Sequence, residues 1–317
     1  MMTLRKVLLA LLAAASAAAS AQPPVLEVLP AQGNVSMIVG PGGNTAVQAG
    51  QEAVVVVDTQ TANASGALLE AIRKLSKKPI RHIIDTSASP QHTGGNEAVA
   101  KAGVYVRLID SIDPRGLDHT ASIIAHINVL AKMSAPVGKV ASTADGAWPT
   151  DTYFTKDWAL YVNNEAIQLF HVPNACTDGD TVVFFRRSDV ISTGDIYNAD
   201  RYPAFDSAQG GSINGVIEGL NLIIDLAIPG ENQNGGTVII PGHGRLSDET
   251  DVVNYRDMLT IIRDRIQAMI AKGGSLQAVL AAKPTSDYDG LYRNNRDSWT
   301  GDKLATAIYQ DLSRSKQ

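Results

Sequence analysis

The chain has 317 residues, a formal net charge of −5 and an apolar content of 44%. This length and apolar content suit one large folded domain with a full core. The acidic balance argues against a basic surface for nucleic acid or anionic lipid, so we expect no nucleic-acid partner. The single cysteine, Cys176, has no second cysteine with which to form an internal disulfide.

The first 21 residues have the pattern of a cleaved secretory signal. Arg5 and Lys6 precede a run of apolar and small residues that is too short to span a bilayer comfortably, and Ala19-Ser20-Ala21 is a cleavage motif. We expect a signal peptide at 1–21 and a periplasmic or secreted mature chain at 22–317. Cleavage removes two positive charges and no acid, which takes the net charge to −7. An uncleaved anchor is the alternative; no later stretch suits a membrane span.

The first half of the mature chain is predicted to alternate strands with helices. The run Val54–Val57 is apolar at every position, which indicates a strand buried on both faces. Helices are predicted where apolar residues recur at helical spacing. The predicted strands lie at 25–39, 45–57, 79–84 and 105–109, and the predicted helices at 65–77 and 120–133.

The second half repeats this order of strands followed by helices. A loop with short strands is expected at 136–161, and a helical extension at about 275–317. Between them, the predicted strands lie at 166–172, 182–185, 190–192 and 237–240, and the predicted helices at 216–228 and 251–271. Two such halves fit two sheets between helices within a single domain over 22–317.

Four polar loops follow predicted strands, where α/β proteins usually place their chemistry. The first and longest of them, at 85–96, reads Asp-Thr-Ser-Ala-Ser-Pro-Gln-His-Thr-Gly-Gly-Asn. The others are Cys176-Thr177-Asp178-Gly179-Asp180, Gly194-Asp195 and Gly242-His243-Gly244.

The order and spacing of these motifs resemble the metallo-β-lactamase fold superfamily, whose first loop reads Thr-His-x-His-x-Asp-His-x-Gly-Gly. Thr86, His92, Gly94 and Gly95 fit this pattern. Segments typical of the secreted bacterial hydrolase branch lie at 123–126, 201–203, 210–213, 240–245 and 253–258. The resemblance implies an αββα sandwich of two mixed β-sheets flanked by helices. In the superfamily, paired metals at one edge of the sandwich activate a water for hydrolysis.

The sequence departs from the superfamily's ligand set at Ser87, Ser89, Gln91 and Cys176. Three of these departures remove histidines, and Gln91 replaces an aspartate. The resemblance implies that one metal site has lost its own ligands, whereas the other keeps His92, Asp195 and His243. Gln91 would be a weaker fourth donor. Two histidines and one carboxylate can hold zinc. We expect at most one zinc per chain; a metal-free protein is equally compatible with the sequence.

The expected function is that of a hydrolase-like protein with a depleted metal centre, acting on an ester, thioester or amide in a small molecule. One alternative is a non-catalytic binding protein that kept the pocket without the metal. Another is a thiol enzyme with Cys176 as the nucleophile. Asp58, at the end of the predicted strand at 45–57, is expected to order the metal loop. No membrane partner is expected after signal cleavage.

Overall fold

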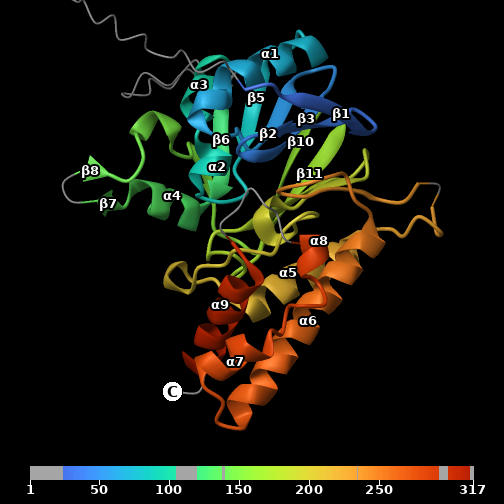
Figure 1. The fold of residues 1–317 in the computed structure, drawn as a ribbon. Helices are drawn as coiled ribbons and strands as arrows, with labels where there is room; N and C mark the ends of the chain where they lie inside the picture. The colour runs from blue at the N-terminus through green and yellow to red at the C-terminus, as the bar shows by residue number, and fades with distance from the viewer. Residues whose placement is uncertain (1–23, 105–119, 138–139, 234, 293–298, 315–317) are drawn as a thin grey trace, which may run out of the picture.

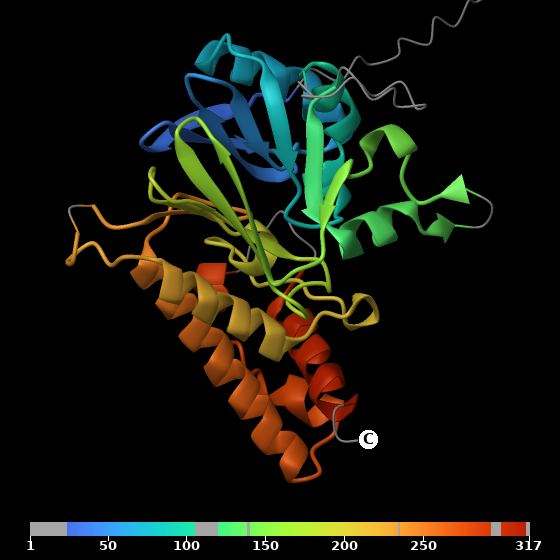
Figure 2. The ribbon, with the colours of Figure 1, turned by 180° about the vertical axis from the view of Figure 1, so that it is seen from behind.

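The structure, a computed structural model, describes residues 24–104, 120–137, 140–233, 235–292 and 299–314. Two β-sheets pack face to face, and helices cover the outer side of each (Figures 1 and 2). The predicted αββα sandwich of two mixed sheets is confirmed. The predicted signal peptide and the predicted strand at 105–109 lie outside the described residues.

The first sheet begins with antiparallel hairpins and continues with parallel strands. Its strands, in spatial order, are β1 (Glu27–Gln32), β2 (Val35–Gly40), β3 (Gly43–Ala49), β4 (Val54–Val57), β5 (Ile80–Ile84), β6 (Ser122–His126) and β9 (Asp151–Tyr153). The predicted segments 25–39 and 45–57 are each divided by a turn, at Gly33-Asn34 and at 50–53. From β4 onward the strands run parallel, so their carboxyl ends meet at one edge.

The second sheet is antiparallel except for its last pair, β13 and β14, which is parallel. Its strands are β10 (Asp157–Val162), β11 (Glu165–His171), β12 (Thr181–Phe185), β13 (Val190–Ser192) and β14 (Val238–Ile240). A separate small hairpin contains β7 (Pro136–Val137) and β8 (Val140–Ala141). The parallel pair again places two strand ends at the same edge.

The helices form the two outer layers (Figure 1). The first sheet is covered by α1 (Ser65–Leu75) and α3 (Asn96–Lys101), and the second by α5 (Ile213–Leu226), α6 (Glu249–Ala271) and α9 (Gly301–Arg314). The short helices are α2 (Pro90–Thr93), α4 (Ile127–Ser134), α7 (Leu276–Ala282) and α8 (Asp289–Tyr292).

The helix predicted at 120–133 is wrong in its first part, because Ser122–His126 forms the buried strand β6. A short apolar run fits a buried strand as well as a helix, so spacing alone misassigned it. The helix α4 begins only after His126, whose ring accepts a hydrogen bond from Asn128 N at the helix start.

Apolar side chains fill three layers of this fold. One lies between α1 and the first sheet and includes Leu68 and Ile72; another lies between the sheets and includes Val55 and Phe185. The third lies under α5 and α6. All four residues of Val54–Val57 have 0% exposure, which confirms the prediction of a strand buried on both faces.

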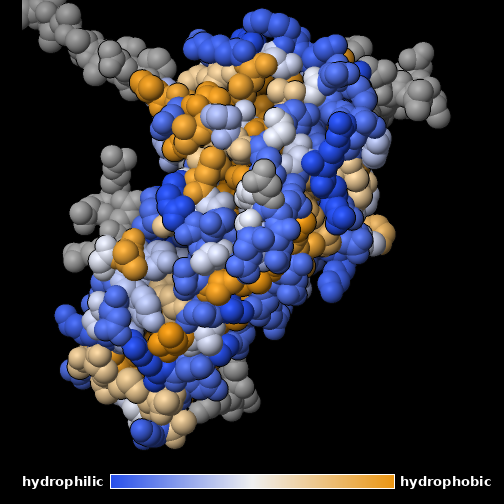
Figure 3. Space-filling model, turned by 90° about the vertical axis from the view of Figure 1, so that its right-hand side faces the viewer, coloured by the Kyte–Doolittle hydropathy of each residue, from blue (hydrophilic) through white to orange (hydrophobic). Residues whose placement is uncertain are grey.

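Hydrophilic side chains cover much of the face seen in Figure 3, interrupted by separate apolar areas. Within the described part of the chain, every helix is too short or too polar to cross a bilayer.

Candidate metal centre

The structure brings His92, Asp195 and His243 together at the sheet edge where the parallel strands end. His92 Nε2 lies 3.0 Å from Asp195 Oδ2, and His243 Nε2 lies 3.4 Å from Asp195 Oδ1. One ligand atom from each of the three side chains lies within 4.8 Å of the others. Both histidines are buried, and the Asp195 side chain is 25% exposed. This arrangement suits one ion at the floor of an open site.

His92 lies on the short helix α2. The residues of the loop at 85–96 favour this helix. Ser89 caps the helix by accepting a hydrogen bond from Gln91 N, and Pro90 occupies the first turn, where its missing N–H costs nothing. Thr93 Oγ1 donates to Ser89 O at 3.1 Å and closes the turn. These contacts fix the backbone of α2, from which the His92 side chain extends.

Asp58 contacts the His92 ring on the Nδ1 side, opposite the atom that faces Asp195. Its Oδ2 lies 2.7 Å from His92 Nδ1 and accepts a hydrogen bond from Thr86 Oγ1, while its Oδ1 accepts one from Thr86 N. A carboxylate at Nδ1 holds a proton there, so in the neutral ring the lone pair is on Nε2, which faces Asp195. The backbone of Asp58 has a φ of +63°, a left-handed conformation that aspartate and asparagine tolerate better than most residues. The structure thus places Asp58 where it can order the metal loop.

Asp195 follows a glycine that the turn requires. Gly194 has a φ of +53°, and a Cβ at this position would lie 2.6 Å from Thr86 Oγ1. Any larger residue would push the Asp195 turn away from the loop that carries His92.

The turn that carries His243 is held by Asn44, a residue of β3 that lies between the predicted strands at 25–39 and 45–57. Asn44 Nδ2 donates to Pro241 O at 2.9 Å and to Gly244 O at 3.0 Å, and Asn44 N donates to Gly242 O at 2.8 Å. The signal in the sequence was the glycine-rich turn at 40–44, but only the tertiary structure shows which loop it contacts.

The three side chains attract one another strongly. Burial opposes charge on Asp195, but His92 and His243 outweigh it and hold the pKa of this carboxyl well below its usual range. Burial likewise opposes protonation of His92, yet the carboxylates of Asp195 and Asp58 raise its pKa well above the usual value. The site therefore favours an anionic Asp195 beside a positive charge.

Two atoms of this cluster are available to bind a cation. Among the described residues, His92 Nε2 and Asp195 Oδ1 are buried and have no hydrogen-bond partner, despite their short distances to neighbouring ligand atoms. Buried polar atoms are rarely left without a partner. Since both atoms converge on the same cluster with His243, the residues present fit one divalent metal.

The replaced positions make other contacts. Ser87 Oγ accepts a hydrogen bond from Ser89 N at 3.2 Å, and Ser89 Oγ is used as the cap of α2. Cys176 Sγ donates to the backbone oxygen of Asp195 at 3.3 Å, and burial raises the pKa of this thiol well above its usual value. A protonated, buried thiol is a poor nucleophile. The Gln91 side chain is exposed at the mouth of the site.

A cavity of about 810 Å³ opens in front of the centre. Asp195 and the replaced positions Ser87, Gln91 and Cys176 line it, with Met133 of α4 on another wall. Asp180 also lines the cavity, and burial, partly offset by hydrogen bonds from Thr177, raises its pKa to about 7. In the sequence, Asp180 is only one residue of a loop motif. Its raised pKa comes from burial, which only the folded structure shows.

A pair of histidines stacks near this edge. The rings of His126 and His171 lie 3.6 Å apart at an angle of 6°. Burial, together with the nearby His171, lowers the pKa of His126 to about 4. An unfolded histidine has a pKa of about 6.5, so the unfolded chain binds this proton first as the pH falls. The contribution of neutral His126 to stability is complete above about pH 6.5 and is lost progressively toward pH 4.

We therefore expect the change in urea midpoint from pH 7 to pH 5 to be less favourable in the native protein than in His126→Gln. The raised pKa values of Asp180 and His92 act in the opposite direction, but equally in both proteins. Urea unfolding of both proteins at the two pH values is the measurement. Because His82 also has its pKa lowered to about 4, mainly by burial, the variant should keep part of the dependence. An equal change of the midpoint in both proteins would show that His126 does not contribute.

No family model matches the sequence, and neither does any curated protein. Several solved structures are similar in fold. A metallo-β-lactamase from Pontibacter korlensis is 15% identical with a TM-score of 0.56, over 74% of this chain and 99% of that one. The sec-alkylsulfatase Pisa1 from Pseudomonas sp. is 15% identical with a TM-score of 0.60, over 90% of this chain.

The chain spans only 50% of that alkylsulfatase. The B3 metallo-β-lactamase BLEG-1 is 17% identical with a TM-score of 0.52, over 74% of this chain and 100% of that one. At such low identity the likeness concerns the fold alone. The protein therefore has the fold of the metallo-β-lactamase superfamily.

Proposed function

We propose that this protein is a metallo-β-lactamase-fold hydrolase that works with a single zinc ion, held by His92, Asp195 and His243. The proposed substrate is a small molecule with an ester, thioester or amide bond. The observation that carries the proposal is the cluster of three ligand atoms within 4.8 Å, two of whose buried members lack hydrogen-bond partners in the described part of the chain.

A zinc ion at this position would act as a Lewis acid and lower the pKa of a water. The protein's own groups perform the remaining tasks. Asp58 keeps the Nε2 lone pair of His92 directed at the cluster, and the cavity of about 810 Å³ holds the substrate beside it. Asp180, whose carboxyl is held by Thr177 and has a pKa raised by burial to about 7, also lines this cavity.

Calorimetric titration of chelator-treated protein with zinc tests the proposal. We expect one site per chain, weaker than that of an enzyme with the full ligand set, because Gln91 supplies no negative charge. His243→Ala should abolish binding, since it removes one of the three ligands. Cys176→Ala is the matched control and should change little, because the thiol bonds to a backbone oxygen.

Two outcomes would contradict this assignment. If zinc gives neither heat nor thermal stabilisation, the non-catalytic binding protein takes the place of the hydrolase. If Cys176→Ala removes binding, the metal lies on a thiolate and the ligand set is wrong.

Restoring the lost ligands is a second test. The combined variant Ser87→His, Ser89→His, Gln91→Asp and Cys176→His places the superfamily's residue types at all four departures. We expect it to bind two zinc ions per chain, measured by elemental analysis, and to gain hydrolysis of a simple ester. If the folded variant binds no additional metal, the residues that orient the ligands have diverged as well.

We also propose that the mature chain is exported to the periplasm or beyond, which the basic start, apolar run and cleavage motif support. The mass of the exported protein should correspond to a chain beginning at or near Gln22.

A further inference from the structure

A second cavity, of about 660 Å³, lies at the end of the sandwich away from the metal centre. Four turns form it: β1–β2, β3–β4, β10–β11 and β12–β13. The β3–β4 and β12–β13 turns precede β4 and β13, whereas Asp58 follows β4 and Asp195 follows β13. This cavity, which we call the turn cleft, is therefore separate from the candidate metal centre.

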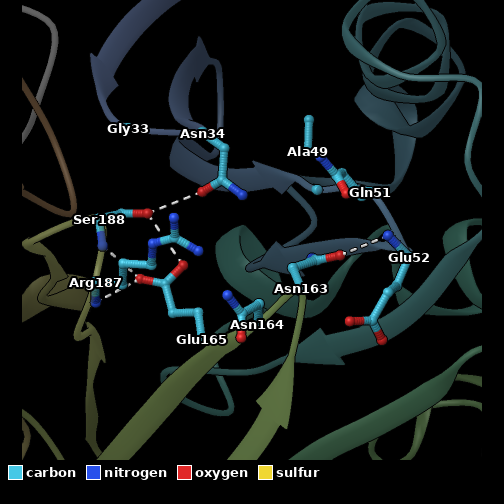
Figure 4. Close-up of a pocket in the computed structure, with 11 residues that line it drawn as sticks. Gly33, Asn34, Ala49, Gln51, Glu52, Asn163, Asn164, Glu165, Arg187 and Ser188 are labelled. Atoms are coloured by element: carbon cyan, nitrogen blue, oxygen red, sulfur yellow. Dashed lines mark hydrogen bonds between the residues drawn. The ribbon is translucent and has the colours of Figure 1, made fainter.

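The floor of the turn cleft is built from two buried polar residues, Glu165 and Asn163 (Figure 4). The carboxylate of Glu165 accepts hydrogen bonds from Arg187 N at 2.8 Å, from Ser188 N at 2.6 Å and from Ser188 Oγ at 3.0 Å. It also contacts Gln48 Nε2 on the opposite sheet.

Asn163 completes the floor. Its Oδ1 accepts from the backbone N–H groups of Glu52 and Ala53, and its Nδ2 donates to Gln48 Oε1 and Ala53 O. A Cβ at Gly50 would lie 2.0 Å from the Asn163 side chain, so only glycine allows this contact. With its polar atoms satisfied, the floor is fixed in position before any ligand arrives.

The rim carries polar groups that are not satisfied. In the part of the chain that the structure describes, the guanidinium of Arg187 and the carboxylate of Glu52 make no ion pair or side-chain hydrogen bond. Figure 4 shows these two residues on opposite sides of the cleft. Asn34 and Asn164 use their Oδ1 atoms as acceptors and leave their Nδ2 groups as free donors among the described residues.

These features select the chemistry of a ligand. The cleft lining contains no aromatic side chain among the described residues, so it offers no platform for a sugar or a base. The lining holds two carboxylates, Glu52 and Glu165, and one cation, Arg187, which disfavours a phosphate or sulfate that has no positive charge of its own. A cation on one side and an anion on the other suit a molecule with a carboxylate at one end and an ammonium at the other. The cavity volume lies in the range of small-molecule sites.

We propose that the turn cleft binds a short peptide with free termini. Arg187 takes the terminal carboxylate, for which a planar guanidinium provides paired donors. Glu52 takes the terminal ammonium, and the Nδ2 groups of Asn34 and Asn164 donate to the peptide carbonyls. The site is independent of the metal centre and does not rest on the proposed hydrolase function.

Nuclear magnetic resonance titration of the full chain with triglycine tests this proposal. Because ion pairs between exposed groups are weak, binding should be weak, with a Kd of about a millimolar or higher. We expect saturable shifts of the amide signals of Asn163, Asn164 and Arg187. N-acetyl-triglycine and triglycine amide, which each lack one terminal charge, should each bind roughly fivefold more weakly.

Variants of the exposed residues Arg187 and Glu52 test the carboxylate contact and the ammonium contact separately. Arg187→Gln should weaken triglycine about fivefold but leave triglycine amide unchanged, because that ligand has no carboxylate to lose. Glu52→Gln should weaken triglycine but leave N-acetyl-triglycine unchanged. His243→Ala should have no effect at the cleft. Absence of saturable shifts at the solubility limit of the peptide, or binding that neither variant alters, would overturn the proposal.

Discussion

Replacing Asp58 with asparagine is expected to weaken zinc binding by about 10–100-fold. Asparagine tolerates the φ of +63° at this position and can still accept the hydrogen bond from Thr86 N. Its amide, however, donates to His92 Nδ1 where the carboxylate accepted. The proton of the ring then moves to Nε2, which faces Asp195 and can no longer bind a metal. Calorimetric titration with zinc gives the affinity.

Asp85→Asn is the matched control for that variant. Asp85 is also fully buried beside the metal loop, and burial, reinforced by the nearby Asp58, raises its pKa well above the usual value. Burial therefore favours its uncharged form, and its bond with Asn96 Nδ2 survives in asparagine. Zinc affinity should change little. If Asp58→Asn binds zinc as tightly as the native protein, Asp58 does not set the tautomer of His92.

Glu165→Ala is expected to lower the free energy of unfolding by about 3–5 kcal/mol. The substitution leaves the donors Arg187 N, Ser188 N and Ser188 Oγ without their acceptor, and it breaks the contact with Gln48 that joins the two sheets. Each unsatisfied buried donor costs about 1–3 kcal/mol, and water entering the cleft offsets part of the sum. The melting temperature should fall by roughly 5–15 °C.

Glu52→Ala provides the comparison for this loss, because Glu52 belongs to the same cleft but is exposed. Its removal should change the unfolding free energy by less than about 0.5 kcal/mol. Thermal melts followed by circular dichroism measure both. A small effect of Glu165→Ala would mean that water replaces the lost acceptor and that the two sheets do not depend on this network.

The sequence determined the fold class because its signals are local. Four consecutive valines at 54–57 predict a doubly buried strand whatever surrounds them, and the glycine and histidine loops follow predicted strands at the superfamily's spacing. The same reasoning failed at Ser122–His126, where a short apolar run fits helix and strand equally well and pairing with β5 decides.

The sequence also indicated three candidate ligands, because the loops that carry His92, Asp195 and His243 resemble the superfamily's metal-binding motifs. The sequence did not show which residues hold these ligands in position. The contact of Asn44 with the His243 turn joins residues almost 200 positions apart, and the raised pKa of Asp180 depends on burial by distant segments. The turn cleft depends likewise on the meeting of four hairpins from two sheets. Contacts of this kind leave no local pattern in the sequence. The sequence determines the residues of each turn, but only the packing of the two sheets determines which turns lie together.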